Sequence, residues 1–366
     1  MGRIERVELY KKIEAHRKRP LIVYVTSKRA GIAAYMATDA LPCIIEQIDR
    51  LPKEAKAVDF LIVSYGGDPM VAWRILTLIR QRLGEEGNVA VLIPQSAYSA
   101  ATLVAFGANS IIMHPNGHLG PVDMQITTFS EGGPKHFSTE DISAFLDFVR
   151  DNLRITDQEH VRMLFELTVK EVGSLGIGFT ARSSKLAVDL GERLLGMHMK
   201  EDEARTKLRS IVENMSRKFQ SHAYPVSRTE ALELGLPVTD RDEALEDLMW
   251  KAWLDIAVEL QEDVPFDPIY ELMKSPEATK LLSPVPQIDL PVGIPGNPSY
   301  QTTLADVIKH AKVTIDPVDF QYTNAIVESP RLAYVQMTKG KILSSRTQDM
   351  KIKYNVITTS RMWEKV

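Results

Sequence analysis

The segment VLIPQSAYSAATLVAFGANSIIMHPNGHLGPVD, residues 91–123, carries most of the information about this chain. It starts in an apolar strand, continues into a helix of small and apolar residues that Ser99 opens, and ends in a turn rich in glycine and proline. A serine there lies near the positive end of the helix dipole, where the next N–H, that of Ala100, can help to hold an oxyanion. The pattern indicates a nucleophile, but a serine that only caps the helix fits it as well.

The residues before this segment alternate between strand and helix. Strands that are apolar at nearly every position are covered on both faces, which is typical of a parallel sheet with crossover helices. We therefore predict an α/β fold that begins with an amphipathic helix at 3–17. The expected strands are 21–25, 58–64, 88–93 and 110–113, and the expected crossover helices are 41–51 and 69–83.

Two adjacent glycines, Gly66 and Gly67, follow the second strand in the sequence SYGGD. Glycine accepts positive φ and leaves backbone N–H groups uncovered, as an oxyanion hole requires. A tight turn between strand and helix is the alternative interpretation.

Further candidates lie downstream. The turn at 113–123 contains His114, His118 and Asp123, and each of its two imidazoles is interpreted as a surface residue. From residue 138 the chain reads mostly as helix. In SHAYPVSRTEALELGLPV, residues 221–238, His222 precedes a proline-stiffened turn and a capping box formed by Ser227 with Glu230. An isolated histidine is usually structural, so the sequence alone leaves its role open.

The composition changes near residue 283, where five prolines occur between 284 and 298. We predict three parts: an N-terminal helix at 1–20, a core domain at 21–282, and a proline-rich linker with a small C-terminal α+β region at 283–366. The C-terminal region contains the β-leaning segments LAYVQMT and KIKYNVITT.

Composition excludes several classes of protein. The chain has 366 residues, with 44 basic and 48 acidic side chains, so it lacks the basic surplus of a nucleic-acid-binding protein. Its single cysteine, Cys43, suits a reducing compartment. The eight histidines show no metal-ligand spacing, and we expect no metal and no cofactor. There is no signal-peptide pattern and no apolar run of about 20 residues, so we expect a cytoplasmic protein without a membrane span.

Taken together, the segments IVSYGGDP, 91–126 and 221–238 resemble the Clp protease and crotonase-like fold. Within that group they are most similar to the serine dehydrogenase proteinase family, and more distantly to signal peptide peptidase A. The resemblance covers roughly residues 5–240. It implies a ββα-superhelix fold, here followed by a C-terminal appendage of mixed α and β structure.

The resemblance also implies an ATP-independent serine peptidase that acts on peptides or proteins and assembles as a homo-oligomer. Ser99 falls on the family's nucleophile, Asp123 on its aspartate and His222 on its histidine. The oxyanion hole falls on Gly66, Gly67 and Ala100. Serine needs a neighbouring base, and that base needs an orienting carboxylate, so these residue types are chemically consistent.

The chain departs from the family pattern at the site. Tyr65 stands where the family usually has proline, and Ala100 and Ala101 stand where it usually has glycine after the nucleophile. Signal peptide peptidase A uses a lysine base instead of histidine, for which Lys135 is the candidate here. A site with no base at all also stays open.

Two other functions remain as alternatives. Acyl-CoA enzymes of the same fold use the oxyanion hole with a pair of carboxylates in place of the serine. A catalytically silent scaffold is the second alternative, with the C-terminal region as its element for binding a partner.

Overall fold

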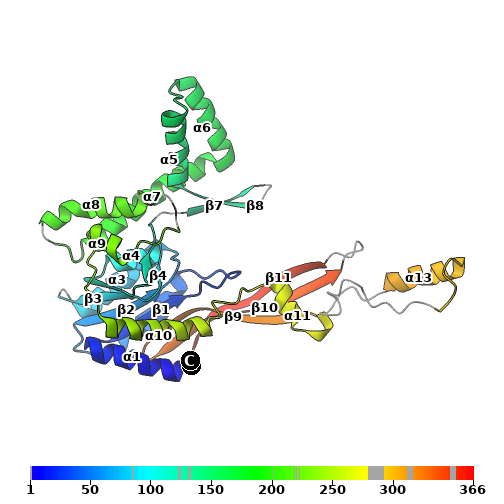
Figure 1. Ribbon diagram of the computed structural model, residues 1–366, viewed down its shortest axis with the longest axis horizontal. Helices are drawn as coiled ribbons and strands as arrows, with labels where there is room; N and C mark the ends of the chain where they lie inside the picture. Colours follow the sequence, from blue (N-terminus) through cyan, green and yellow to red (C-terminus); the bar gives the residue numbers. More distant parts are fainter. Residues whose placement is uncertain are drawn as a thin grey trace.

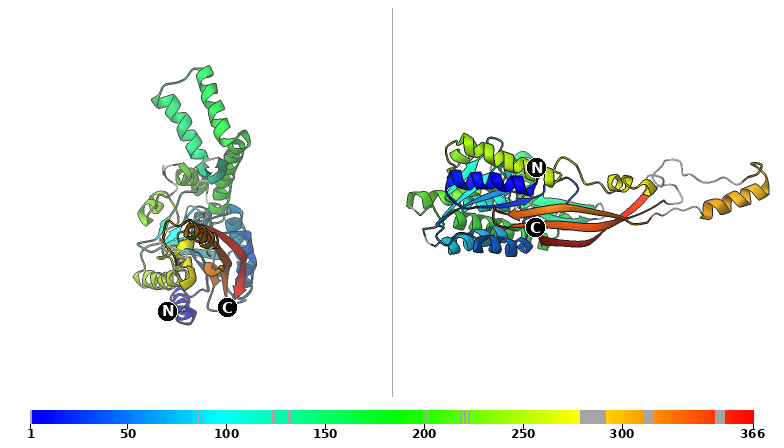
Figure 2. Two further views of the ribbon diagram at one scale, coloured as in Figure 1. Left: turned by 90° about the vertical axis from the view of Figure 1, so that its right-hand side faces the viewer. Right: turned by 90° about the horizontal axis from the view of Figure 1, so that it is seen from below.

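The computed structural model describes residues 2–366 apart from 85, 123–124, 131–132, 201, 218, 220, 222, 279–291, 311–315 and 347–351. Its centre is a seven-stranded sheet covered by helices on both faces, which Figures 1 and 2 show from three sides. In spatial order the strands are β11 (Ile352–Lys365), β10 (Ala333–Arg346), β9 (Val318–Glu328), β1 (Leu21–Thr26), β2 (Ala57–Val63), β3 (Asn88–Ile93) and β5 (Ser110–Met113).

Strands β1, β2, β3 and β5 run parallel to one another, as their continuous apolar sequences predict. Crossovers join them through α2 (Leu41–Asp49), α3 (Pro69–Leu83) and α4 (Ala100–Phe106). The predicted α/β class, the four strands and the crossover helices are confirmed.

Successive strand residues enter two different cores, because side chains alternate between the faces of a sheet. In β1, Ile22 and Tyr24 pack with α2, α3 and α4 on one face. Leu21, Val23 and Val25 pack on the other face against α1 (Arg3–Arg17) and α10 (Glu243–Glu259), which lie side by side. All six residues of β1 are buried, so both faces of this strand are covered.

The C-terminal strands continue this sheet. β9 runs antiparallel to β1, with Val23 opposite Glu328 and Thr26 opposite Ala325. On its other edge β9 pairs with β10 along its length, from Val318 to Glu328, and β10 pairs with β11. The three strands extend beyond β1 as a ribbon (Figure 1). The two β-leaning C-terminal segments are confirmed as strands. The proposed boundary near 283 lies outside the described residues, and the three-part domain division stays a prediction.

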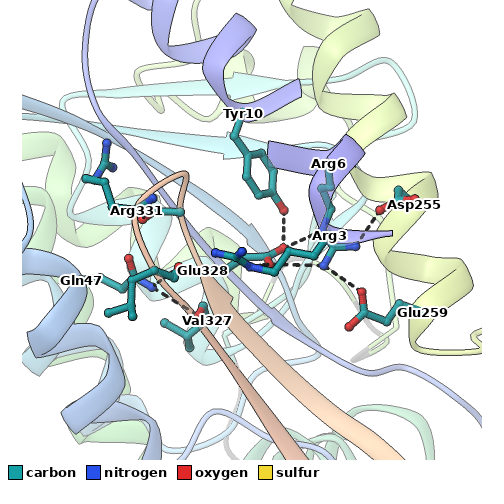
Figure 3. Close-up of polar contacts among 11 residues, drawn as sticks. Arg3, Arg6, Tyr10, Gln47, Asp255, Glu259, Val327, Glu328 and Arg331 are labelled. Atoms are coloured by element: carbon teal, nitrogen blue, oxygen red, sulfur yellow. Dashed lines mark hydrogen bonds and ion pairs between the residues drawn. The ribbon is translucent and has the colours of Figure 1, made fainter. Parts of the chain in front are cut away.

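A buried ionic cluster joins β9 to α1 and α10 (Figure 3). Arg6 of α1 donates from Nε to Oε1 of Glu328 and from Nη1 to Oδ2 of Asp255, both at 2.6 Å. Tyr10 Oη donates to Oε1 of the same Glu328, also at 2.6 Å. Arg6 is 1% exposed, so its charge depends on these partners. The first helix and the last third of the chain therefore stabilise each other.

A helical arm projects from the body (Figure 1). In the chain it lies after the core strands and before α10. It follows a β-hairpin, β7 (Gln125–Ser130) with β8 (Gly133–Ser138), that the sequence analysis does not predict. Among the helices that the structure describes, none is long and apolar enough to cross a membrane. The remaining elements are η1 (Thr38–Ala40), β4 (Ser96–Ala97), β6 (His118–Leu119), α5 (Thr139–Asp147), η2 (Phe148–Asn152), α6 (Gln158–Val172), α7 (Ser174–Leu195), α8 (Asp202–Arg217), α9 (Arg228–Glu233), α11 (Pro268–Met273) and α13 (Pro298–His310).

Candidate active site

A ladder of short bridges lies beyond the carboxyl ends of the parallel strands and brings the sequence motifs together. Ser64 pairs with Ala97, β4 pairs with β6, and Leu119 of β6 pairs with Val226. The glycine pair, the serine segment, the 113–123 turn and the 221–238 segment thus become neighbours. Open α/β sheets place their sites at this edge.

Ser99 has a backbone conformation that is rare for any residue other than glycine. Its φ is 52° and its ψ is −116°, at the N-cap of α4. Its side chain makes no capping hydrogen bond, although Leu103 N–H donates to its carbonyl oxygen at 3.1 Å. The hydroxyl therefore does not act as a helix cap. Such strained conformations cost about 1–3 kcal/mol and are found mostly at functional sites.

The glycine pair is held on both sides by backbone hydrogen bonds. Met36 N–H donates to the carbonyl oxygen of Gly66 at 2.8 Å, and Asp68 N–H donates to that of Met36 at 2.9 Å. Both glycines have positive φ, 98° at Gly66 and 150° at Gly67. A side chain at Gly67 would place its Cβ 2.3 Å from the Met36 carbonyl oxygen, so this position requires glycine.

The backbone donors near Ser99 are not equivalent. Gly66 N–H donates to Oγ of Ser64 at 3.0 Å, and that hydroxyl also shares a 2.7 Å hydrogen bond with Thr26. By contrast, neither Gly67 N–H nor Ala100 N–H has an acceptor within the part of the chain that the structure describes. Two of the three predicted oxyanion residues thus have an N–H to offer, while that of Gly66 is already engaged.

The aspartate and the histidine of the predicted triad, Asp123 and His222, are not among the described residues. Their neighbours in sequence do approach the site: Tyr98 Oη donates to the carbonyl oxygen of Ala223 at 3.3 Å, and Val122 N–H donates to that of Met215 at 3.2 Å. Lys135, the candidate lysine base, lies in β8 opposite Thr128.

The two imidazoles of the 113–123 turn are half-buried rather than fully exposed. The His118 ring packs against that of Tyr98, with 5.4 Å between centroids, and His114 stacks on Trp250 at 4.7 Å. Burial lowers the pKa of both histidines. They serve as packing partners of the aromatic residues.

Lys28, which no sequence motif singles out, follows β1 at the same edge of the sheet. Its Nζ lies 4.6 Å from the centroid of the Trp253 ring and 5.7 Å from that of Tyr65. Burial lowers the pKa of Lys28 to about 8, although the nearby carboxylate of Glu262 acts in the opposite direction. Its position after a buried strand was visible in the sequence, but one lysine in a loop gives no signal by itself.

Comparison with known proteins bears on these observations. Residues 3–133 match the model of a family described as ClpP-like SDH-type serine proteinase. The resemblance to the serine dehydrogenase proteinase family is confirmed over this segment. The matched segment includes the glycine pair, Ser99 and the 113–123 turn, and the fold is of the ClpP-like kind.

Two curated relatives come from Methanocaldococcus jannaschii. Uncharacterized protein MJ0137 is 24% identical over 53% of this chain and 57% of its own length. Uncharacterized protein MJ1495 is 23% identical over 52% of this chain and 54% of its own length. The chain thus spans about half the length of the curated relatives it matches.

Similar solved structures include two mutants of the 1510-N membrane-bound stomatin-specific protease, one of them in complex with a substrate peptide. Each is 16% identical to this chain, with a TM-score of 0.36. The aligned part is 62% of this chain, and 82% and 78% of the two structures.

Proposed function

We propose that this protein is a serine peptidase whose nucleophile is Ser99. The observation that carries the proposal is the strained backbone of Ser99, which keeps the hydroxyl from capping α4. A serine that only capped a helix would adopt an extended backbone conformation, and its hydroxyl would accept a hydrogen bond from an N–H group of the first turn. The match to a serine proteinase family supports the same reaction class.

In the proposed reaction, Ser99 Oγ attacks the peptide carbonyl carbon and gives its proton to the base. The resulting oxyanion is held by the N–H groups of Gly67 and Ala100. The C–N bond then breaks, and the base protonates the leaving amine. Water, deprotonated by the same base, hydrolyses the acyl-enzyme and returns Ser99 to its starting state.

For the base we propose His222, oriented by Asp123, with Lys135 as the alternative. The proximity of Ala223 to Tyr98 supports this choice, because Ala223 follows His222 in the chain and Tyr98 precedes Ser99. The bonds of Val122 to Met215 and of Gly120 to Ala97 support a place for Asp123 on the same side.

We further propose that the enzyme needs no ATP, acts on peptides or proteins in the cytoplasm, and works as a homo-oligomer. The location rests on the single cysteine, Cys43, which suits a reducing compartment, and the other statements rest on the family resemblance. A silent scaffold is the outcome expected if Ser99 lacks an activating base.

The test is covalent labelling of the full chain with a fluorophosphonate, which reacts only with serines that a base has activated. We expect one adduct, mapped to Ser99 by mass spectrometry, and no adduct in Ser99→Ala. Ser174→Ala is the matched control, because Ser174 also opens a helix, α7, but is exposed and forms no part of this site. Absence of labelling in the wild type, or labelling that survives Ser99→Ala, would refute the proposal.

A further inference from the structure

Lys28 contacts an aromatic cluster next to the proposed catalytic residues. Its Nζ lies over the ring of Tyr65, the residue before Gly66. The Tyr65 ring meets the ring of Tyr98, the residue before Ser99, edge to face at 5.6 Å. His118 packs against the same Tyr98. The ammonium group is thus connected to the nucleophile's turn through direct ring contacts.

The ammonium group of Lys28 is held by a hydrogen bond to Gln95 and by two aromatic rings, none of which carries a negative charge. An ammonium group has three donors, and the acceptor that the described residues provide is Oε1 of Gln95. The faces of Trp253 and Tyr65 attract a cation without cancelling its charge. Within the described chain, Lys28 Nζ forms no ion pair with a carboxylate.

Glu262 is an acidic group whose charge acts on Lys28, yet its oxygens accept hydrogen bonds from other donors. Its Oε1 accepts from the Ser27 hydroxyl and from the Lys28 backbone N–H, both at 2.8 Å, and its Oε2 accepts from the same N–H at 3.1 Å. The carboxylate therefore fixes the backbone of the loop, and among the described residues the side-chain ammonium keeps donors without an acceptor.

We propose that Lys28 binds a carboxylate of the peptide substrate, so that the site selects peptides with an acidic group next to the bond that is cut. This inference rests on the proposed peptidase function. A charge-assisted hydrogen bond from a desolvated ammonium is strong, and a ligand carboxylate would supply an anionic acceptor that the described residues do not provide.

The protonation state of Lys28 is compatible with binding an anion. Because its pKa is about 8, the amine is mostly charged at neutral pH. Among the described residues, the titratable groups that act on or contact Lys28 are Glu262, Tyr65 and His118. Affinity for an acidic peptide should therefore fall as the pH rises through 8, while affinity for a neutral peptide stays constant.

The test measures peptide binding to the full chain with Ser99→Ala, so that no peptide is cut, by fluorescence anisotropy. Peptides are compared in pairs that differ only in Glu or Gln at each position, and in a free or amidated C-terminus. The two kinds of pair distinguish an acidic side chain from a terminal carboxylate as the bound group. We expect one acidic member to bind about tenfold more tightly than its neutral partner.

Adding Lys28→Met should remove the preference for the acidic peptide without changing the affinity for the neutral one. Lys28→Arg, which keeps the positive charge, should retain most of the preference. Lys274→Met is the control, since Lys274 also lies over an aromatic ring, that of Tyr270, but is exposed and paired with Glu271. Equal affinity for all pairs, a preference that survives Lys28→Met, or no peptide binding would overturn the inference. Fluorophosphonate labelling of Ser99 in the wild type reports on the peptidase proposal separately.

Discussion

Gly66 and Ser99 are in direct contact, although 33 positions separate them in the chain (99 − 66). A Cβ at Gly66 would lie 2.7 Å from Cβ of Ser99, 2.6 Å from the carbonyl oxygen of Tyr98 and 3.0 Å from the nitrogen of Ala100. Carbon atoms that are not bonded prefer a separation of about 3.5–4.0 Å, so no side chain fits there. The glycine loop thus packs directly against the turn that carries the proposed nucleophile.

Gly66→Ala should therefore abolish labelling of Ser99, because the new methyl group displaces the serine turn. Gly84→Ala is the matched control, since Gly84 also has a positive φ, 85°, but a Cβ there meets nothing within 4 Å. Both variants carry the backbone strain of alanine at positive φ, and only the first adds the collision. Equal labelling by the two variants would contradict this contact as the cause. For each variant, the labelling rate of Ser99 and the midpoint temperature of thermal unfolding are measured.

Ser64 positions the glycine loop, and Ser64→Ala should slow the labelling of Ser99. The change leaves the buried Gly66 N–H without its acceptor, which costs about 1–3 kcal/mol and frees the loop that carries Gly67. Thr26→Val removes the other partner of the Ser64 hydroxyl but keeps the bond to Gly66. It should lower the free energy of unfolding without slowing the labelling. A parallel loss of labelling in both variants would show that the effect is general destabilisation.

The identity of the base can be decided by substitution. We expect His222→Ala to reduce the labelling rate of Ser99 by about 10²–10⁴, the usual contribution of a general base, and Lys135→Ala to leave it unchanged. His160→Ala, at an exposed histidine on α6, serves as the control. The reverse pattern, with loss only in Lys135→Ala, would assign the base to the lysine.

Arg6 should be critical for stability. Arg6→Met removes the buried cation that Glu328 and Asp255 share, and breaking a buried pair in this way costs about 3–5 kcal/mol. Urea unfolding measures the loss. The exposed Arg150, which pairs with Asp151, provides the comparison, and Arg150→Met should change stability little.

If Arg6→Met fails to fold, the double variant Arg6→Met with Glu328→Gln should recover part of the stability, because it also removes one of the buried negative charges. A double variant no more stable than the single one would argue against an electrostatic cause.

The protein should lose stability as the pH falls below about 6.5, the usual pKa of histidine in an unfolded chain. Burial lowers the pKa of His198 in the fold, and Arg80 acts in the same direction, while the 2.9 Å contact of Nε2 with the Phe106 carbonyl opposes it. The folded state then binds fewer protons than the unfolded state, so acid favours unfolding. Urea unfolding at pH 5 and pH 7.5 should show a smaller difference for His198→Gln than for the wild type.

His114 and His118, whose pKa values burial also lowers, contribute to the same slope, so His198→Gln should remove only part of it. The exposed His160→Gln provides the reference. An unchanged pH dependence in His198→Gln would contradict the role of His198.

The parallel half of the sheet, and the position of Ser99 at the start of α4, could be predicted from the amino-acid sequence. Strands such as LIVYV have no polar position, so they fit only where both faces are covered. Ser99 at the start of a small-residue helix, and two glycines after a buried strand, are local signals that need no knowledge of distant residues. The family resemblance followed from these same segments.

Local signals did not reveal the β7–β8 hairpin or the role of Lys28. The ammonium group of Lys28 is positioned by the rings of Trp253 and Tyr65, which belong to other parts of the chain. In the same way, the pairing of β9 with β1 and the bond from Arg6 to Glu328 join residues as far as 322 positions apart. Tertiary structure decided these features, because hydrophobic periodicity reports which face of an element is buried and not which distant element covers it.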